Sequence, residues 1–163
     1  MELLEGVARI DGLEAFLARL DEAGETHGVT VQAFDARYVV DRAHLERAVE
    51  FADRAIECDD AIARERGVEI MLYAAGRRQI ERALEMGVSE GECPVVLLVD
   101  GPGDEAGAAA ALADLLADAD VLGTYDRERV REFFDVSDAE LTAADGDLPG
   151  LVRERVALLV VEK

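Results

Sequence analysis

Glu69-Ile-Met-Leu-Tyr73-Ala-Ala-Gly76-Arg77-Arg78-Gln79-Ile80-Glu81-Arg82-Ala83-Leu84 is the stretch that fixes the helical part of the predicted fold, because it places a glycine between two candidate helices. The period of residues 68–75 fits a helix or a strand, and its length favours a helix that ends near Gly76. Residues 78–86 predict the next helix, which Gly87 ends.

The same stretch carries three arginines within six residues, in a chain whose net charge is −20. An arginine cluster beside a helix-ending glycine is a candidate contact for an anion or a nucleic acid. The alternative is a solvated helix face, on which arginines pair with nearby acids such as Glu81.

Strand and helix patterns alternate through the rest of the chain. Residues 3–10 predict an edge strand, and Leu13, Phe16, Leu17 and Leu20 recur at helical spacing before a polar break at residues 22–28. Strands are predicted at residues 29–34 and 94–99, and helices after the N-cap candidate Asp41 and at residues 107–119, 127–134, 138–143 and 148–159. The pattern predicts an α+β fold: one domain, residues 1–163, with a small sheet covered by several helices.

The composition indicates a salt-adapted protein. The chain has 163 residues, 50% of them hydrophobic, which is enough for one folded domain. Acidic residues number 37 against 17 basic ones, and every basic residue except Lys163 is arginine. Carboxylates keep a protein hydrated in a high-potassium cytoplasm, where a Debye length of roughly 3 Å at about 1 M salt screens their repulsion. The first residues are acidic and the apolar runs at 95–99 and 156–161 are too short to cross a bilayer, so we expect a cytoplasmic protein without a membrane partner.

Catalytic, metal and cofactor sites are not predicted. The loop Gly101-Pro-Gly-Asp-Glu-Ala-Gly107 follows a strand and precedes a helix, but its third glycine is one residue late for a dinucleotide loop and it carries two acids where phosphates would lie. The remaining candidates have simpler roles: free thiols for Cys58 and Cys93, structural positions for His27 and His44, a core position for Tyr73, and no neighbouring base for Ser89 or Ser137.

The string Glu-x-x-x-Tyr-x-x-Gly-x-Arg-Gln-Ile, from Glu69 to Ile80, resembles the small KEOPS-complex subunit of the Cgi/TPRKB family. The resemblance runs from residues 29–36 through 44–49 and this string to the apolar C-terminal segment, and it favours a helix at residues 68–75. Archaeal members of the family carry the Arg-Gln pair, so the chain resembles an archaeal version. Its acidic composition makes that version a halophilic one.

The resemblance implies a non-catalytic subunit that binds the kinase-like ATPase of KEOPS and tRNA, and that contacts other KEOPS subunits indirectly. Its expected role is to help present tRNA for N6-threonylcarbamoyladenosine (t6A) modification. Residues matching the segment that holds the 3′ CCA end are Gly76, Arg77, Arg78 and Gln79. Residues matching the kinase-facing helix are Leu151, Val152, Arg155, Val156 and Leu159, although an apolar stripe at this spacing also fits the chain's own core.

Physical chemistry supports an anion at the arginine cluster. If residues 77–79 open a helix, their free backbone N–H groups and the positive end of the helix dipole face a phosphate together with the guanidinium groups. Two other classes of function stay open. One is an α/β nucleotide-handling enzyme built on residues 95–107, and the other is an acidic interaction scaffold that does not bind RNA.

Overall fold

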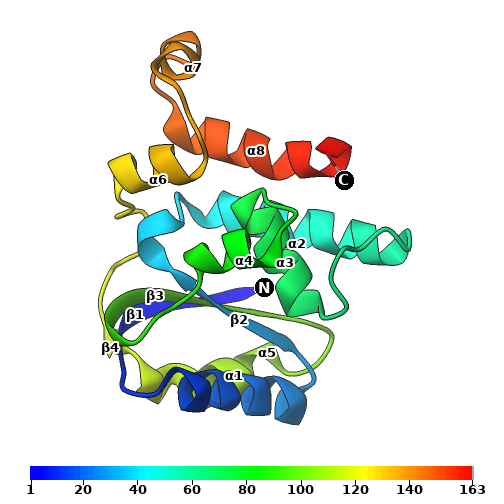
Figure 1. Ribbon diagram of the computed structural model, residues 1–163. Helices are drawn as coiled ribbons and strands as arrows, with labels where there is room; N and C mark the ends of the chain where they lie inside the picture. The colour runs from blue at the N-terminus through cyan, green and yellow to red at the C-terminus, as the bar shows by residue number, and fades with distance from the viewer. Residues whose placement is uncertain (163) are drawn as a thin grey trace. The chain divides into compact units, whose positions relative to one another are not determined.

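The computed structural model describes residues 1–162 and shows an α+β fold, as expected (Figure 1). The chain divides into two units, residues 1–36 with 87–122, and residues 37–86 with the chain from Gly123 onward. Each unit combines two separate stretches of sequence, so neither is a contiguous piece of the chain. That the whole chain forms one domain stays a prediction.

The first unit holds a four-stranded antiparallel sheet in the order β2-β3-β1-β4. Its strands are β1 (Glu2–Ile10), β2 (Thr30–Asp35), β3 (Gly91–Asp100) and β4 (Ala117–Asp118). Residues 95–99 of β3 are fully buried, which confirms the predicted buried strand. The prediction that the first strand lies at an edge is wrong, because β1 pairs along its length with β3 and also with the two-residue β4.

Helices α1 (Leu13–His27) and α5 (Glu105–Leu112) pack on each other and on this sheet (Figure 1). The predicted break at residues 22–28 is wrong, because α1 continues to His27 and ends at Gly28, whose φ is 69°. Ala23 and Gly24 are buried, so the polar residues of this turn lie on its outer side and leave the helix intact. The predicted helix at 107–119 is shorter than expected, because residues 113–115 form a 3₁₀ turn and residues 117–118 form β4.

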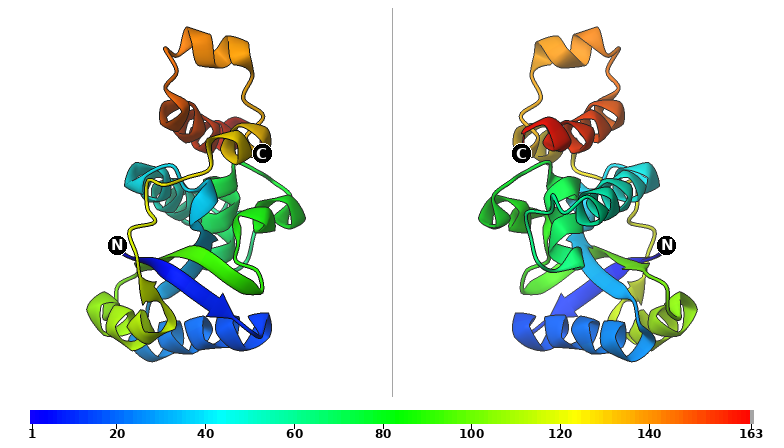
Figure 2. Two further views of the ribbon diagram at one scale, coloured as in Figure 1. Left: turned by 90° about the vertical axis from the view of Figure 1, so that its left-hand side faces the viewer. Right: turned by 90° about the vertical axis from the view of Figure 1, so that its right-hand side faces the viewer.

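The second unit is helical. It contains α2 (Arg42–Glu57), α3 (Arg66–Ala75), α4 (Ile80–Ala83), the 3₁₀ turn η2 (Leu84–Met86), α6 (Arg127–Phe133), α7 (Asp138–Ala143) and α8 (Leu148–Glu162), and the 3₁₀ turn η1 (Ala36–Tyr38) leads into it. Helices α2, α3 and α8 pack on one another. Helix α7 stands off from α6 and α8 on two connecting segments (Figure 2).

Helix ends in this unit follow the sequence signals. The Asp41 side chain accepts a hydrogen bond from the His44 amide at 2.8 Å, which confirms the predicted N-cap of α2. Helix α3 ends at Gly76, as predicted. The predicted helix over residues 78–86 is only one α-helical turn, α4, followed by η2.

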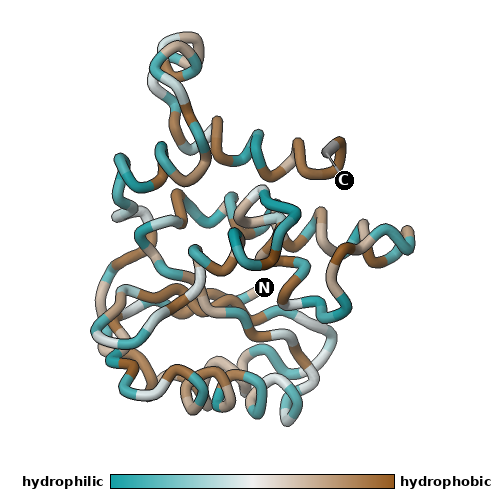
Figure 3. The backbone as a smooth tube through the Cα atoms, viewed as in Figure 1, coloured by the Kyte–Doolittle hydropathy of each residue, from teal (hydrophilic) through white to brown (hydrophobic). Residues whose placement is uncertain are grey.

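Apolar residues follow the strands and the C-terminal half of α8 (Figure 3). Within residues 1–162, each helix is either too short or too polar to cross a lipid bilayer.

Candidate functional site

The turn after α3 requires glycine for two reasons. The φ of Gly76 is 60°, and the Gly76 and Arg77 amides donate to the carbonyls of Tyr73 and Leu72, each at 3.0 Å. These bonds satisfy two of the last carbonyl groups of α3 and end the helix. A Cβ atom at Gly76 would also lie 3.2 Å from the Arg155 carbonyl oxygen, so α8 passes against the turn.

Arg77 turns inward from this glycine. Its guanidinium donates to the carbonyl of Phe133, the last residue of α6, and lies over the Phe133 ring at 5.3 Å from the centroid. The final carbonyl groups of a helix have no partner within the helix, so Arg77 supplies one for α6. The expectation that Arg77 presents its guanidinium freely to a ligand therefore differs from the structure.

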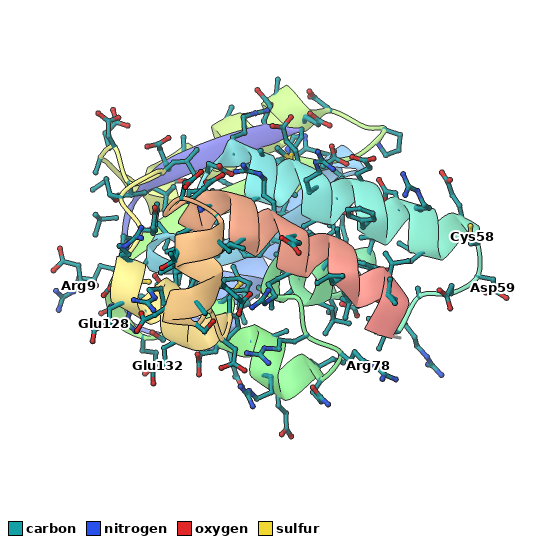
Figure 4. The ribbon with its side chains drawn as sticks, turned by 90° about the horizontal axis from the view of Figure 1, so that it is seen from above. Arg9, Cys58, Asp59, Arg78, Glu128 and Glu132 are labelled. Carbon is teal, nitrogen blue, oxygen red and sulfur yellow. The ribbon has the colours of Figure 1, made fainter. Side chains whose placement is uncertain are left out.

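Arg78 and Gln79 point outward. Both are exposed, and Figure 4 shows Arg78 extending away from the ribbon. Within residues 1–162 neither Arg78 nor Arg82, which is exposed on α4, has an ion-pair partner. Two of the three arginines of the cluster thus keep their guanidinium groups available.

The helix dipole contributes little at this turn. Gln79 is the N-cap of α4, but α4 has four residues and its N-cap makes no side-chain hydrogen bond. A single turn carries only a small part of a full helix macrodipole. Attraction of an anion here would come from Arg78 and Arg82 themselves.

A hollow of about 650 Å³ lies beside Arg82. It is lined by Tyr38, Arg82, Glu85, Asp126, Glu128, Arg129, Glu132 and Phe133. Arg129 lies 3.6 Å from the Asp126 carboxylate and over the Tyr38 ring, and the backbone N–H of Arg129 lowers the pKa of Asp126. The four carboxylates outnumber the two arginines, so the hollow itself disfavours a phosphate.

The apolar stripe of α8 lies inside the second unit. Val152, Val156 and Leu159 are fully buried, and Leu151 is 8% exposed. These four side chains contribute to the chain's own core, so the expectation that they form an open docking face differs from the structure. The outer side of the same helix exposes three other apolar residues near its end, Leu158, Val160 and Val161, the last being 80% exposed.

Arg155, the fifth residue expected on the partner-facing stripe, is also engaged within the chain. Its guanidinium donates to the Phe134 and Asp135 carbonyls, both at 3.1 Å, and to the Glu140 carboxylate at 2.7 Å. The bond from Arg155 holds the pKa of Glu140 below its usual value.

Two further fixed positions of the string, Glu69 and Tyr73, are structural. Glu69 is fully buried on α3, and its Oε1 atom accepts hydrogen bonds from the Ile62 and Ala63 amides at 3.0 and 2.8 Å. Tyr73 is 1% exposed and stacks on Phe51, so it lies in the core, as predicted. Sequence reasoning did not assign a role to Glu69; the available signal was one acid on the otherwise apolar side of a helix.

The loop at residues 101–107 gives no support to a nucleotide site. The Asp104 side chain accepts from the Gly107 amide at 2.9 Å, and Glu105 accepts from the Gly101 amide at 3.1 Å. A phosphate would need these N–H groups, so the loop acts as a turn with a helix cap, as predicted. Cys58 and Cys93 are free thiols, and no group of metal-ligating side chains is found among residues 1–162.

Comparison with known proteins shows the family to which the chain belongs. No curated protein matches the chain. Residues 14–159, which include α3, the Gly76 turn and most of α8, match the family described as "Kinase binding protein CGI-121". This match covers most of the sequence, and the chain therefore belongs to the CGI-121 family.

Proposed function

We propose that this chain is a non-catalytic subunit that binds a kinase and tRNA. The family description supports a kinase as the partner. In this proposal the kinase is the kinase-like ATPase of KEOPS, as the resemblance of the string from Glu69 to Ile80 implies. In this proposal the subunit supports t6A modification of tRNA, while the chemistry belongs to its partners.

The kinase docks on the outer side of the C-terminal half of α8. This location is favoured by Leu158, Val160 and Val161, which are exposed apolar residues on a helix whose other side is already buried. Exposed apolar side chains that gather on one element are typical of protein interfaces. The kinase contacts thus come from these residues in place of Leu151, Val152, Arg155, Val156 and Leu159.

The tRNA 3′ CCA end binds at the turn that follows Gly76. The observation that carries this proposal is the pair of exposed arginines without ion-pair partners within residues 1–162, Arg78 and Arg82, in a chain of net charge −20. Gln79 lies between them and offers hydrogen-bond donors and an acceptor to base edges. Arg77 and Gly76 shape the turn in this proposal, and Arg78 and Gln79 contact the RNA.

Salt limits the electrostatic part of this binding. Neutralising about two phosphates on a single strand predicts roughly a thirty- to fortyfold loss of affinity between about 0.15 M and 2 M salt. Hydrogen bonds and stacking are screened less than charge pairs. The turn must therefore recognise bases as well as phosphates to act in molar salt.

A charge-matched pair of variants tests the tRNA site. Arg78→Glu should weaken tRNA binding at least about tenfold, measured by filter binding or anisotropy in constant KCl. Arg47→Glu is the control, because Arg47 is also exposed and makes the same charge change on α2. Removing the CCA from the tRNA should weaken binding to the parent comparably.

Equal losses of tRNA affinity in the Arg78 and Arg47 variants would mean that the overall charge of the protein causes the effect. The turn after Gly76 would then not be the tRNA site. If the parent protein binds its kinase but not tRNA, the result would favour the alternative function, an acidic interaction scaffold that does not bind RNA. The net charge of −20 is compatible with this alternative.

A further inference from the structure

Arg155, on α8, and Arg77, in the turn between α3 and α4, meet the same end of α6. Arg77 donates to the Phe133 carbonyl, and Arg155 donates to the next two carbonyls, those of Phe134 and Asp135. Phe134 caps α6, and Asp135 has a φ of 58°, so the chain turns sharply just after the helix. Three consecutive carbonyl groups at a helix end are therefore held by two guanidinium groups.

The backbones of the two segments also touch. A Cβ atom at Gly76 would lie 3.2 Å from the Arg155 carbonyl oxygen and 3.5 Å from the Arg155 Cβ. The turn that carries Arg77, Arg78 and Gln79 thus rests on the backbone of α8 at Arg155 while its first arginine reaches α6. Loss of the Arg155 side chain would leave the Phe134 and Asp135 carbonyls without this donor and would loosen the end of α6 to which Arg77 is bonded.

We infer that Arg155 is a positioning residue for the arginine turn: it sets the direction in which Arg78 and Gln79 leave the protein, and its side chain serves this turn instead of the kinase interface. The effect of Arg155 on tRNA binding rests on the proposed tRNA site. Its effect on the turn rests only on the contacts within residues 1–162. The geometry requires a guanidinium, because its planar fork donates to Phe134, Asp135 and Glu140 together, which the single ammonium group of lysine does not reproduce.

The test compares two charge-conserving changes on α8. Arg155→Lys should weaken tRNA binding about fivefold or more, although the net charge is unchanged. Arg153→Lys is the matched control, because Arg153 pairs with Asp41 at the start of α2 and makes no hydrogen bond or ion pair with α6 or Gly76 within residues 1–162. Its tRNA affinity should stay within about twofold of the parent.

A double variant separates positioning from general destabilisation. In an Arg78→Ala background, Arg155→Lys should have less than about a twofold further effect on tRNA affinity, because its effect passes through the turn. Fully additive losses would mean that Arg155 acts elsewhere, and equal losses from the Arg155 and Arg153 changes would also overturn the inference.

Amide hydrogen exchange tests the positioning without RNA. The Gly76 and Arg77 amides should exchange about fivefold faster or more in Arg155→Lys, and at the parent rate in Arg153→Lys. Unchanged exchange at both amides in Arg155→Lys would overturn the inference whether or not the parent binds tRNA. If these amides exchange faster in Arg155→Lys but the parent binds no tRNA, Arg155 still positions the turn. Only the proposed tRNA-binding function would then be wrong.

Discussion

The Nε2 atom of His44 lies 2.7 Å from the carbonyl oxygen of Ala74, and this bond joins the first turn of α2 to the last turn of α3. The Val40 amide donates to Nδ1 of the same ring at 3.3 Å, so the imidazole is neutral and Nε2 carries the hydrogen. Phe134 packs edge-on against the ring. The histidine predicted to be structural thus holds the helix that ends at the arginine turn.

Acid should weaken this connection. Burial, partly offset by the bond to Ala74 and by Asp41, lowers the pKa of His44 from 6.5 to about 4. The unfolded chain gains a proton near pH 6.5 and the folded chain resists it, so the stability from neutral His44 is complete above pH 6.5 and is lost as the pH falls towards 4. The shift corresponds to about 3 kcal/mol in the free energy of unfolding.

His44→Gln supplies the reference for that measurement, because glutamine keeps an N–H donor for Ala74 and does not titrate. The difference in unfolding free energy between parent and variant, from urea melts, should shrink by about 3 kcal/mol between pH 7 and pH 4. Carboxylates titrate in both proteins and cancel. Parallel pH curves would show that His44 takes up its proton at the same pH in the folded protein as in the unfolded chain.

A glutamate on the inner side of α8 should destabilise the fold, whereas a glutamate on its outer side should only disrupt kinase binding. Leu151→Glu places a carboxylate at a position that is 8% exposed, and it should lower the free energy of unfolding by several kcal/mol in urea melts. Leu158→Glu, at a position that is 38% exposed, should change it by about 0.5 kcal/mol or less and abolish co-purification with the kinase in molar KCl. A folded Leu158 variant that still binds the kinase would place the interface elsewhere.

Glu69 should prove to be a loop anchor. Glu69→Ala removes the acceptor for the Ile62 and Ala63 amides and should cost about 1–3 kcal/mol in the free energy of unfolding. Limited proteolysis should then cut the α2–α3 connection first. Glu69→Gln, which keeps one acceptor oxygen, should restore most of the protection, and equal cleavage of the two variants would contradict the anchor.

Potassium chloride should stabilise the folded chain. Salt screens the mutual repulsion of carboxylates that outnumber the basic groups, and a net charge of −20 makes this repulsion larger than the loss from weakened ion pairs. The melting temperature should rise between about 0.1 M and 2 M KCl. A flat or falling melting temperature would show that the acidic surface is not an adaptation to salt.

Local signals predicted much of the fold. Asp41 marked the start of α2 and Gly76 the end of α3 because caps and left-handed glycines are properties of a few neighbouring residues. The predicted length of α1 and the predicted edge position of β1 were wrong, because both depend on what the segment packs against. Local periodicity shows that a segment has a buried face. It does not show which distant segment packs on that face or pairs with the strand.

The site was predicted less completely for the same reason. The arginine cluster was visible in the sequence, but its division into an inward Arg77 and an outward Arg78 depends on Phe133, 56 residues away from Arg77. The stripe on α8 was recognised as apolar, and a helical period does not say whether such a stripe meets the same chain or a partner. The three-dimensional packing of α8 on α2 and α3 decides this for Leu151, Val152, Val156 and Leu159.

The two thiols of the chain differ sharply in accessibility, with Cys93 buried in the sheet and Cys58 exposed at the C-cap of α2 (Figure 4). A maleimide dye should therefore label the native protein at one position without any engineered cysteine. Because Cys58 lies in the same helical unit as the arginine turn and α8, a dye there gives a fluorescence signal for the rates at which kinase and tRNA arrive and leave. The natural sequence thus already contains the attachment site for the dye with which stopped-flow experiments can measure the order of assembly.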